Sequence, residues 1–175
     1  ASRSWRASAT GSSDGNLLRR STHASVNSVA MNESLPLERG RAYFDSNSVI
    51  YFIEASPEFY AKVSSLWYAL IEQNATFVTS EICVAECFYG AFRRKSQVLE
   101  RGYDRLFFEE RAFDIRPVDL ETLIGAARLG ADLGLRLIDA VHFRTALASQ
   151  CDIFVTNDRR FRSSHGVRVV QIAEL

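Results

Sequence analysis

The chain has 175 residues, an apolar content of 47% and equal numbers of basic and acidic residues. This length suits one domain with its own core, and no apolar run reaches the roughly 18–20 residues of a membrane-spanning helix. From residue 41 onward, 16 Lys and Arg stand against 18 Asp and Glu. This balance excludes an overall basic protein that holds nucleic acid by net charge, so such a ligand would need a local basic patch or a bound cation.

Residues 1–40 differ in composition from the rest of the chain. Ser and Arg are frequent among the first thirty residues, Asp14 is the one acid there, and the apolar residues show no period. We therefore expect a disordered or non-native tail over 1–40. Two explanations stay open: an organellar transit peptide, or a tag or translated sequence upstream of a start at Met31. We expect the folded domain to span 41–175.

Apolar periodicity predicts alternating strands and helices after residue 40. In chain order we predict a strand over 41–44, helices over 48–54 and 57–73, a strand over 75–79, helices over 80–94 and 97–110, a strand over 113–118, helices over 119–133 and 137–150, and strands over 152–156 and 167–171. Ser80 and Asp119 are suitable N-caps, and Gly134 ends the helix that Asp119 begins. This order predicts an α/β fold with a mostly parallel sheet.

The cysteines are Cys83, Cys87 and Cys151. An odd count without a secretory signal favours a reducing compartment, so we expect a cytoplasmic protein without a disulfide framework. Cys83 and Cys87 lie one helical turn apart. They are interpreted either as two buried helix residues or as half of a zinc site, although no second Cys/His pair has finger-like spacing.

Four acidic residues fall where an α/β fold can bind a ligand. Asp45 and Asp158 follow predicted strands, and the crevice beyond the carboxyl ends of parallel strands is the usual binding site. Glu86 lies inside the helix predicted over 80–94, and Asp139 lies at the start of a later helix. Singly, each has an ordinary explanation, because Asp residues cap helices and a helical Glu can face solvent.

Together, the four acids favour a metal site. Carboxylates about 4 Å apart repel by ~4 kcal/mol per pair at an effective dielectric constant near 20, so a cluster is either protonated or holds a divalent cation. Oxygen ligands select Mg²⁺ or Mn²⁺, which can activate water for attack on a phosphodiester. His142 lies three residues after Asp139 on the same side of its helix, and we interpret it as a core or supporting residue.

Four stretches of the sequence carry a family resemblance. They are YFDSN at 43–47, SEICVAE at 80–86, LIDAVH at 137–142 and FVTNDRRF at 154–161. They resemble the acidic motifs of PIN-domain nucleases, above all the toxin component (VapC) of VapBC toxin–antitoxin pairs, and the resemblance covers about residues 41–175. One departure is Ile138, where relatives often have Pro before the third acid.

The resemblance implies a PIN-like, Rossmann-like sandwich with a central parallel sheet of about five strands flanked by helices. It also implies a homodimeric, Mg²⁺- or Mn²⁺-dependent endoribonuclease that is neutralised by a small antitoxin protein. The implied metal-binding and catalytic acids are Asp45, Glu86, Asp139 and Asp158. The implied supporting polar residues are Asn47, Thr156 and Asn157.

Basic and aromatic side chains are candidates for contacts with partners. We predict that Arg159, Arg160 and Arg162, which follow the fourth acid, contact RNA phosphates. The basic residues at 93–95 are interpreted either as further phosphate contacts or, preferably, as a solvated helix carboxyl end, where cations favour the dipole. Tyr60, Trp67 and Tyr68 are interpreted as either a dimer surface or helix core.

Two other functions stay open at this point. A phosphatase of the haloacid-dehalogenase type also has Asp after its first strand, but it needs a second Asp two residues later, where this chain has Asn47. An inert PIN-like module that binds RNA or a protein would keep the fold without the catalysis. The sequence has no Walker loop or Gly-x-Gly-x-x-Gly run, so we expect no nucleotide cofactor.

Overall fold

The computed structural model describes residues 40–175, so the prediction for the tail at 1–40 lies almost wholly outside the described residues. The strands are β1 (Arg41–Phe44), β2 (Thr76–Ser80), β3 (Asp114–Arg116), β4 (Ile153–Thr156) and β5 (Arg168–Gln171). The helices are α1 (Ser46–Ile53), α2 (Tyr60–Glu72), α3 (Glu81–Arg93), α4 (Gln97–Asp104), α5 (Leu120–Leu133) and α6 (Leu137–Ala148). A π-helical turn over Arg105–Glu109 continues α4, and a 3-10 turn over Ile172–Glu174 follows β5.

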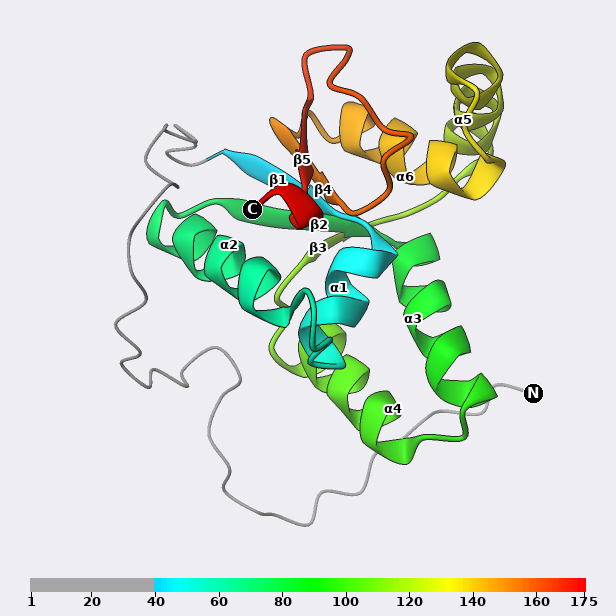
Figure 1. The fold of residues 1–175 in the computed structure, drawn as a ribbon. Helices are drawn as coiled ribbons and strands as arrows, with labels where there is room; N and C mark the ends of the chain where they lie inside the picture. The colour runs from blue at the N-terminus through cyan, green and yellow to red at the C-terminus, as the bar shows by residue number, and fades with distance from the viewer. Residues whose placement is uncertain (1–39) are drawn as a thin grey trace, which may run out of the picture.

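All five strands form one parallel sheet in the order β3-β2-β1-β4-β5. The predicted α/β sandwich with a central five-stranded parallel sheet is therefore confirmed. Figure 1 shows α1, α2 and α4 on one face of the sheet and α5 and α6 on the other. The chain builds outward from β1 to β3, then returns to add β4 and β5 on the other side. The direction of building thus changes between β1 and β4, and ligands of such sheets bind beyond the strand ends at this point.

Apolar side chains cover both faces of the central strands. Along β1, Phe44 points to the α1–α2 side and packs against Trp67, whereas Tyr43 points to the α6 side and stacks on Phe154. This two-sided burial explains why the strands read as continuous apolar runs. Trp67 is fully buried, so of its two interpretations the helix core is confirmed; Tyr60 and Tyr68 are partly exposed.

The helix ends follow the predicted capping residues. The Asp119 side chain accepts a hydrogen bond from Thr122 N at 2.8 Å, and Gly134 ends α5 in the left-handed region at φ 67°. Ser80 caps α3, whose buried face includes Cys83 and Cys87. Burial of both cysteines agrees with their interpretation as core residues. Within residues 40–175, no helix combines the length and the hydropathy needed to cross a membrane.

One helix start and one capping role differ from the prediction. The helix predicted from residue 57 begins at Tyr60, because residues 57–59 form a turn before it. The last long helix begins at Leu137 with Arg136 as its N-cap, so Asp139 lies in the first turn and is not the cap. A carboxylate in this turn is still favoured by the helix dipole.

Candidate active site

Asp45 directly follows β1 at the carboxyl edge of the sheet and is only 5% exposed. Its Oδ1 accepts hydrogen bonds from Ser48 N at 2.8 Å and from Ser48 Oγ at 2.6 Å, so Asp45 does cap α1. Its Oδ2 accepts a bond from Thr156 Oγ1 at 2.6 Å. Burial raises the pKa of the Asp45 carboxyl, and the hydrogen bonds from Ser48 and Thr156 oppose the shift. A nearby cation would favour the charged form of this buried acid.

The loop after β4 carries Asp158 to the same edge. β4 pairs with β1 in parallel, so the two strands end side by side. The hydroxyl of Thr156, the last residue of β4, donates to Asp45 and accepts a hydrogen bond from Asp158 N at 3.0 Å. One buried threonine hydroxyl therefore links the side chain of the first acid to the backbone of the fourth. Thr156, one of the predicted supporting polar residues, thus lies between these two acids.

Arg160 joins Asp158 to Asp139. Its Nε lies 3.0 Å from both carboxylate oxygens of Asp158, and its Nη2 contacts Asp158 Oδ2 and lies 2.6 Å from Asp139 Oδ2. The guanidinium holds the pKa of Asp158 below its usual range. A positive group therefore stands between two carboxylates that come from different elements, the β4–β5 loop and α6.

Glu86 reaches the site from α3 through a contact with α6. Its Oε2 lies 2.8 Å from Nε2 of the buried His142, and Nδ1 of this ring lies 2.9 Å from Tyr43 Oη. Because Tyr43 donates its own proton to Ser80 Oγ, both ring nitrogens can donate only if the imidazole is charged. Burial lowers the pKa of His142, but the hydrogen bond that His142 donates to Glu86 and nearby negative groups outweigh it and raise this pKa overall.

The four predicted acids are connected by polar side chains from neighbouring elements. Thr156 lies between Asp45 and Asp158, and Arg160 lies between Asp158 and Asp139. On α6, His142 follows Asp139 and contacts Glu86. Ser46, next to Asp45, also bonds to Glu86. The acids thus gather at one edge, linked through intermediates. In the part of the chain that the structure describes, no three His, Cys, Asp or Glu side chains are close enough to hold one ion.

The donor set fits a hard divalent cation in two respects. All four candidate ligands are carboxylates, which suit Mg²⁺ or Mn²⁺. The Arg160 guanidinium also acts as a stand-in cation, because it shows that the oxygens of Asp139 and Asp158 can share one positive group.

Comparison with known proteins decides the family. A model of the family described as the PIN domain matches residues 42–164. The chain belongs to the PIN domain family. No curated protein matches its sequence significantly.

Several solved structures share the fold of this PIN domain. VapBC2 from Rickettsia felis, bound to a promoter DNA fragment, has 21% identity and a TM-score of 0.57 over 75% of this chain and 98% of the other. FitAcB from Neisseria gonorrhoeae has 20% identity and a TM-score of 0.59 over 77% and 99%. A toxin–antitoxin complex from Klebsiella pneumoniae has 20% identity and a TM-score of 0.55 over 72% and 94%. At these identities, the comparison establishes the fold.

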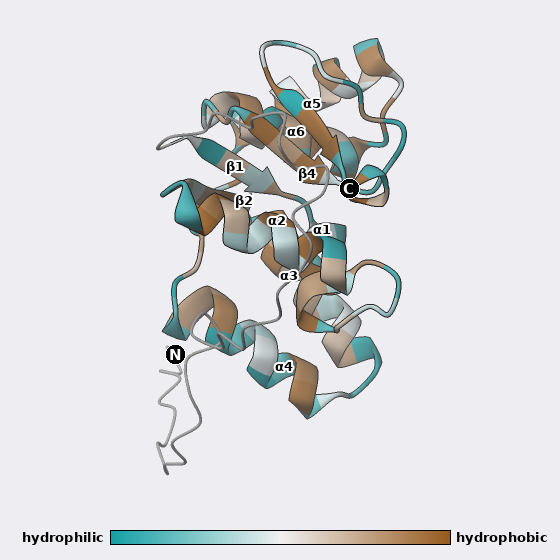
Figure 2. Ribbon diagram, turned by 60° about the vertical axis from the view of Figure 1, so that its left-hand side comes forward, coloured by the Kyte–Doolittle hydropathy of each residue, from teal (hydrophilic) through white to brown (hydrophobic). Residues whose placement is uncertain are grey.

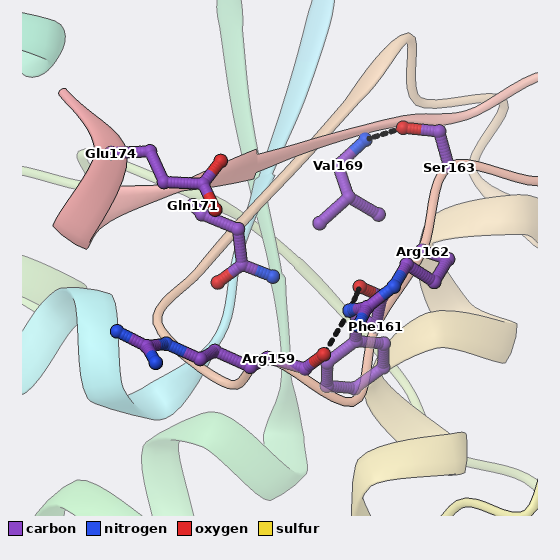
Figure 3. A pocket seen from close by; sticks show the side chains of 7 residues that line it. All are labelled: Arg159, Phe161, Arg162, Ser163, Val169, Gln171 and Glu174. Atoms are coloured by element: carbon purple, nitrogen blue, oxygen red, sulfur yellow. Dashed lines mark hydrogen bonds between the residues drawn. The ribbon is translucent and has the colours of Figure 1, made fainter.

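Other residues predicted for the site of this PIN domain lie around its rim. Asn47 is exposed on the first turn of α1. Asn157 accepts a hydrogen bond from Ala173 N at 3.0 Å, so it holds the turn after β5. Arg159 and Arg162 line a pocket of about 270 Å³ beside Asp158. In Figure 3 the Arg159 side chain extends along this pocket, while Arg162 bonds back to the carbonyl groups of Arg159 and Phe161.

The sequence prediction missed three supporting residues. Ser48 holds Asp45 through two hydrogen bonds, Ser46 contacts Glu86, and Tyr43 orients His142. Ser48 could have been found from the sequence, because it lies three residues after Asp45. The backbone N–H at that position is the usual donor to a capping Asp side chain. Nothing in the sequence indicates the other two contacts. At the end of α3, Arg94 pairs with Glu54, which favours the structural explanation for the basic residues at 93–95.

The Glu86–His142 pair predicts a pH-dependent contribution to stability. Because the pKa of His142 is raised on folding, its contribution is complete below the unfolded value near 6.5 and is lost as the pH rises through the raised value. Burial raises the pKa of Glu86, but bonds from His142 and Ser46 outweigh it, so this pKa is lowered. The Glu86 contribution is therefore complete above about 4.5 and is lost as the pH falls through the lowered value.

We therefore expect His142→Gln to lower the free energy of unfolding more near pH ~5.5 than near pH ~8.5, measured by urea denaturation. The same substitution at the exposed His165 serves as the control and should show little difference between the two pH values. Equal destabilisation by His142→Gln at both values would contradict an ionised pair.

Proposed function

We propose that this PIN domain is a metal-dependent endoribonuclease that hydrolyses phosphodiester bonds in RNA, with Asp45, Glu86, Asp139 and Asp158 as its metal-binding and catalytic acids. The observation that supports the proposal is that four acids from four segments lie at the switch point of the sheet, linked to one another through Thr156, Arg160 and His142. Carboxylates gathered in this way favour a nearby cation, because a positive charge compensates their repulsion.

Mg²⁺ or Mn²⁺ is the proposed cofactor. When bound, such an ion lowers the pKa of water and neutralises charge on the phosphoryl group. The chain itself orients the ligands: Ser48 and Thr156 fix Asp45, and His142 fixes Glu86. These fixed hydrogen bonds keep the carboxylates in position before substrate arrives, which is how enzymes lower the cost of reorganisation.

Arginine side chains beside Asp158 are the proposed RNA contacts. Arg159 and Arg162 line the adjoining pocket, and Arg160 is within reach of the acids themselves. Guanidinium groups bind phosphate in a bidentate manner, which positions the backbone without reading the sequence. The rest of the domain is nearly neutral, so its net charge does not attract RNA. These arginines provide the local positive charge instead.

Removal of divalent metal tests the proposed reaction. We expect EDTA to reduce cleavage of a labelled RNA by the purified protein to background, and excess Mn²⁺ to restore it. Cleavage followed on a gel measures both steps, and a metal-independent ribonuclease treated in parallel controls for effects of EDTA on the substrate. Cleavage that EDTA leaves unchanged would contradict metal catalysis.

We further propose that the protein is the toxin of a type II toxin–antitoxin pair in the cytoplasm, acting as a homodimer neutralised by a small antitoxin. The solved VapBC2 and toxin–antitoxin structures with this fold support the proposal. Exposed apolar side chains, such as Tyr89 and Phe92 on α3 and Leu120 and Ile124 on α5, provide surfaces of the kind that partners cover. We expect a short reading frame next to the gene for this chain to encode a small DNA-binding protein. That protein should copurify with the chain.

An inert PIN-like module is the second candidate. The observation in its favour is that Asp139 and Asp158 already have a cation, Arg160, between them. Calorimetric titration with Mn²⁺ distinguishes the two functions, because an inert module has no ion-binding site that depends on Asp45 and Asp158. The phosphatase alternative loses its support, since the fold is that of PIN domains and position 47 is Asn.

A further inference from the structure

Arg160 makes more contacts with the candidate site than any phosphate-binding role requires. Its guanidinium bonds to both oxygens of Asp158 through Nε, and a single nitrogen, Nη2, touches Asp158 Oδ2 and Asp139 Oδ2. The backbone also takes part, since Arg160 N donates to Asp158 Oδ1 at 2.9 Å. All donor groups that face the acids are thus in use, and the side chain is 40% exposed.

The atoms that Arg160 occupies are those that a metal ion would need. A divalent cation shared by Asp139 and Asp158 would bind their carboxylate oxygens, and Oδ2 of each already contacts Nη2. Two positive groups at these oxygens repel each other, so the ion binds more weakly while the guanidinium is in place. The guanidinium and the ion therefore compete for the two carboxylates.

The local structure permits Arg160 to leave without unfolding the loop. Phe161 is buried against Phe143 and Phe154, and it anchors the chain directly after Arg160. The arginine side chain itself is long and lies on the exposed side of the turn. A change of rotamer is thus enough to free Oδ2 of both carboxylates, while Arg160 N keeps its bond to Asp158 Oδ1.

We propose that Arg160 is an internal counter-ion of Asp139 and Asp158 that competes with the divalent cation, and so sets the metal concentration at which the site is loaded. The proposal rests on the proposed metal-dependent function. In the metal-free protein the guanidinium keeps the two carboxylates together and compensated. In the loaded protein it is displaced to the rim, where it is available to an RNA phosphate.

Mn²⁺ affinity tests the proposal directly. Isothermal titration of the full chain with Mn²⁺ alone is expected to give about three- to tenfold tighter binding for Arg160→Gln than for the unchanged protein, since the competing ion pairs are removed. The matched control is Arg159→Gln, which removes the same charge one residue away, from a side chain that extends along the neighbouring pocket. We expect less than a twofold change for it. Arg160→Lys, which keeps the charge but loses the fork of donors, should fall between the two.

The outcomes separate this proposal from the one on which it rests. Equal affinities for Arg160→Gln and Arg159→Gln, or weaker binding by Arg160→Gln, would overturn the competition while leaving metal-dependent cleavage intact. Failure of all the proteins, the unchanged chain included, to bind Mn²⁺ would overturn the proposed function itself. Circular dichroism of each variant shows that the comparison is made between folded proteins.

Discussion

Replacing Asp45 by Asn is expected to lower the rate of RNA cleavage by about a thousandfold, or ~4 kcal/mol in activation free energy, while the domain stays folded. The Asn side chain keeps an oxygen that can accept from Ser48 N, so α1 retains its N-cap. What is lost is the negative charge at the centre of the site. Single-turnover cleavage of a labelled RNA measures the effect, and circular dichroism reports the fold.

The matched control for this variant is Asp152→Asn. Asp152 precedes β4 at the opposite edge of the sheet, where it is exposed and accepts a hydrogen bond from Arg41 N at 2.7 Å. The same change of charge at this position should leave the rate within about twofold. Full activity of purified Asp45→Asn would refute the assignment of the site.

Trp67→Ala is expected to cost about 3–5 kcal/mol of unfolding free energy, as large core truncations do. The indole is fully buried on α2 and packs against the rings of Phe52 at 4.4 Å and Phe77 at 4.5 Å between centroids. Since domains of this size are stable by only about 5–15 kcal/mol, the variant should lose a large fraction of its stability. Urea denaturation followed by far-ultraviolet circular dichroism measures the loss.

Trp67→Phe is the control for this core position. It keeps an aromatic ring against Phe52 and Phe77 and removes the indole N–H, which is buried and has no hydrogen-bond partner among the described residues. We therefore expect it to cost less than half as much as Trp67→Ala. A loss below about 1 kcal/mol in the alanine variant would show that the α2 core contributes little.

The fold could be predicted from the sequence because its signals are local. Each central strand is a short apolar run, and helices start at Ser80 and Asp119, whose side chains bind backbone amides three residues later. Alternatives stayed open where burial decides between them. Trp67 resembles its surface neighbours on α2 in sequence, and only the packing of this helix on the sheet identifies it as core.

The candidate site could be predicted only in part. Strand ends indicate Asp45 and Asp158, and motif resemblance adds Glu86 and Asp139, but none of these signals contains the contacts between segments. The bond from Ser46 to Glu86, the bond from Thr156 to Asp45 and the bridge made by Arg160 join residues far apart in the chain. The residue pattern predicts helices, strands and helix caps. Contacts between distant segments depend instead on the register between β1 and β4, which the pattern does not give.

The position of β4 in the sheet has a consequence for synthesis of the protein. β4 lies between β1 and β5, although it is made after the other strands and helices that surround Asp45. A growing chain therefore carries Asp45, Glu86 and Asp139 for some time before Thr156 and Asp158 emerge from the ribosome. Until β4 inserts beside β1, Thr156 and Asp158 cannot reach Asp45 at the carboxyl edge of the sheet. Under the proposed ribonuclease function, the nascent polypeptide would therefore stay harmless to the RNA of the ribosome that is making it.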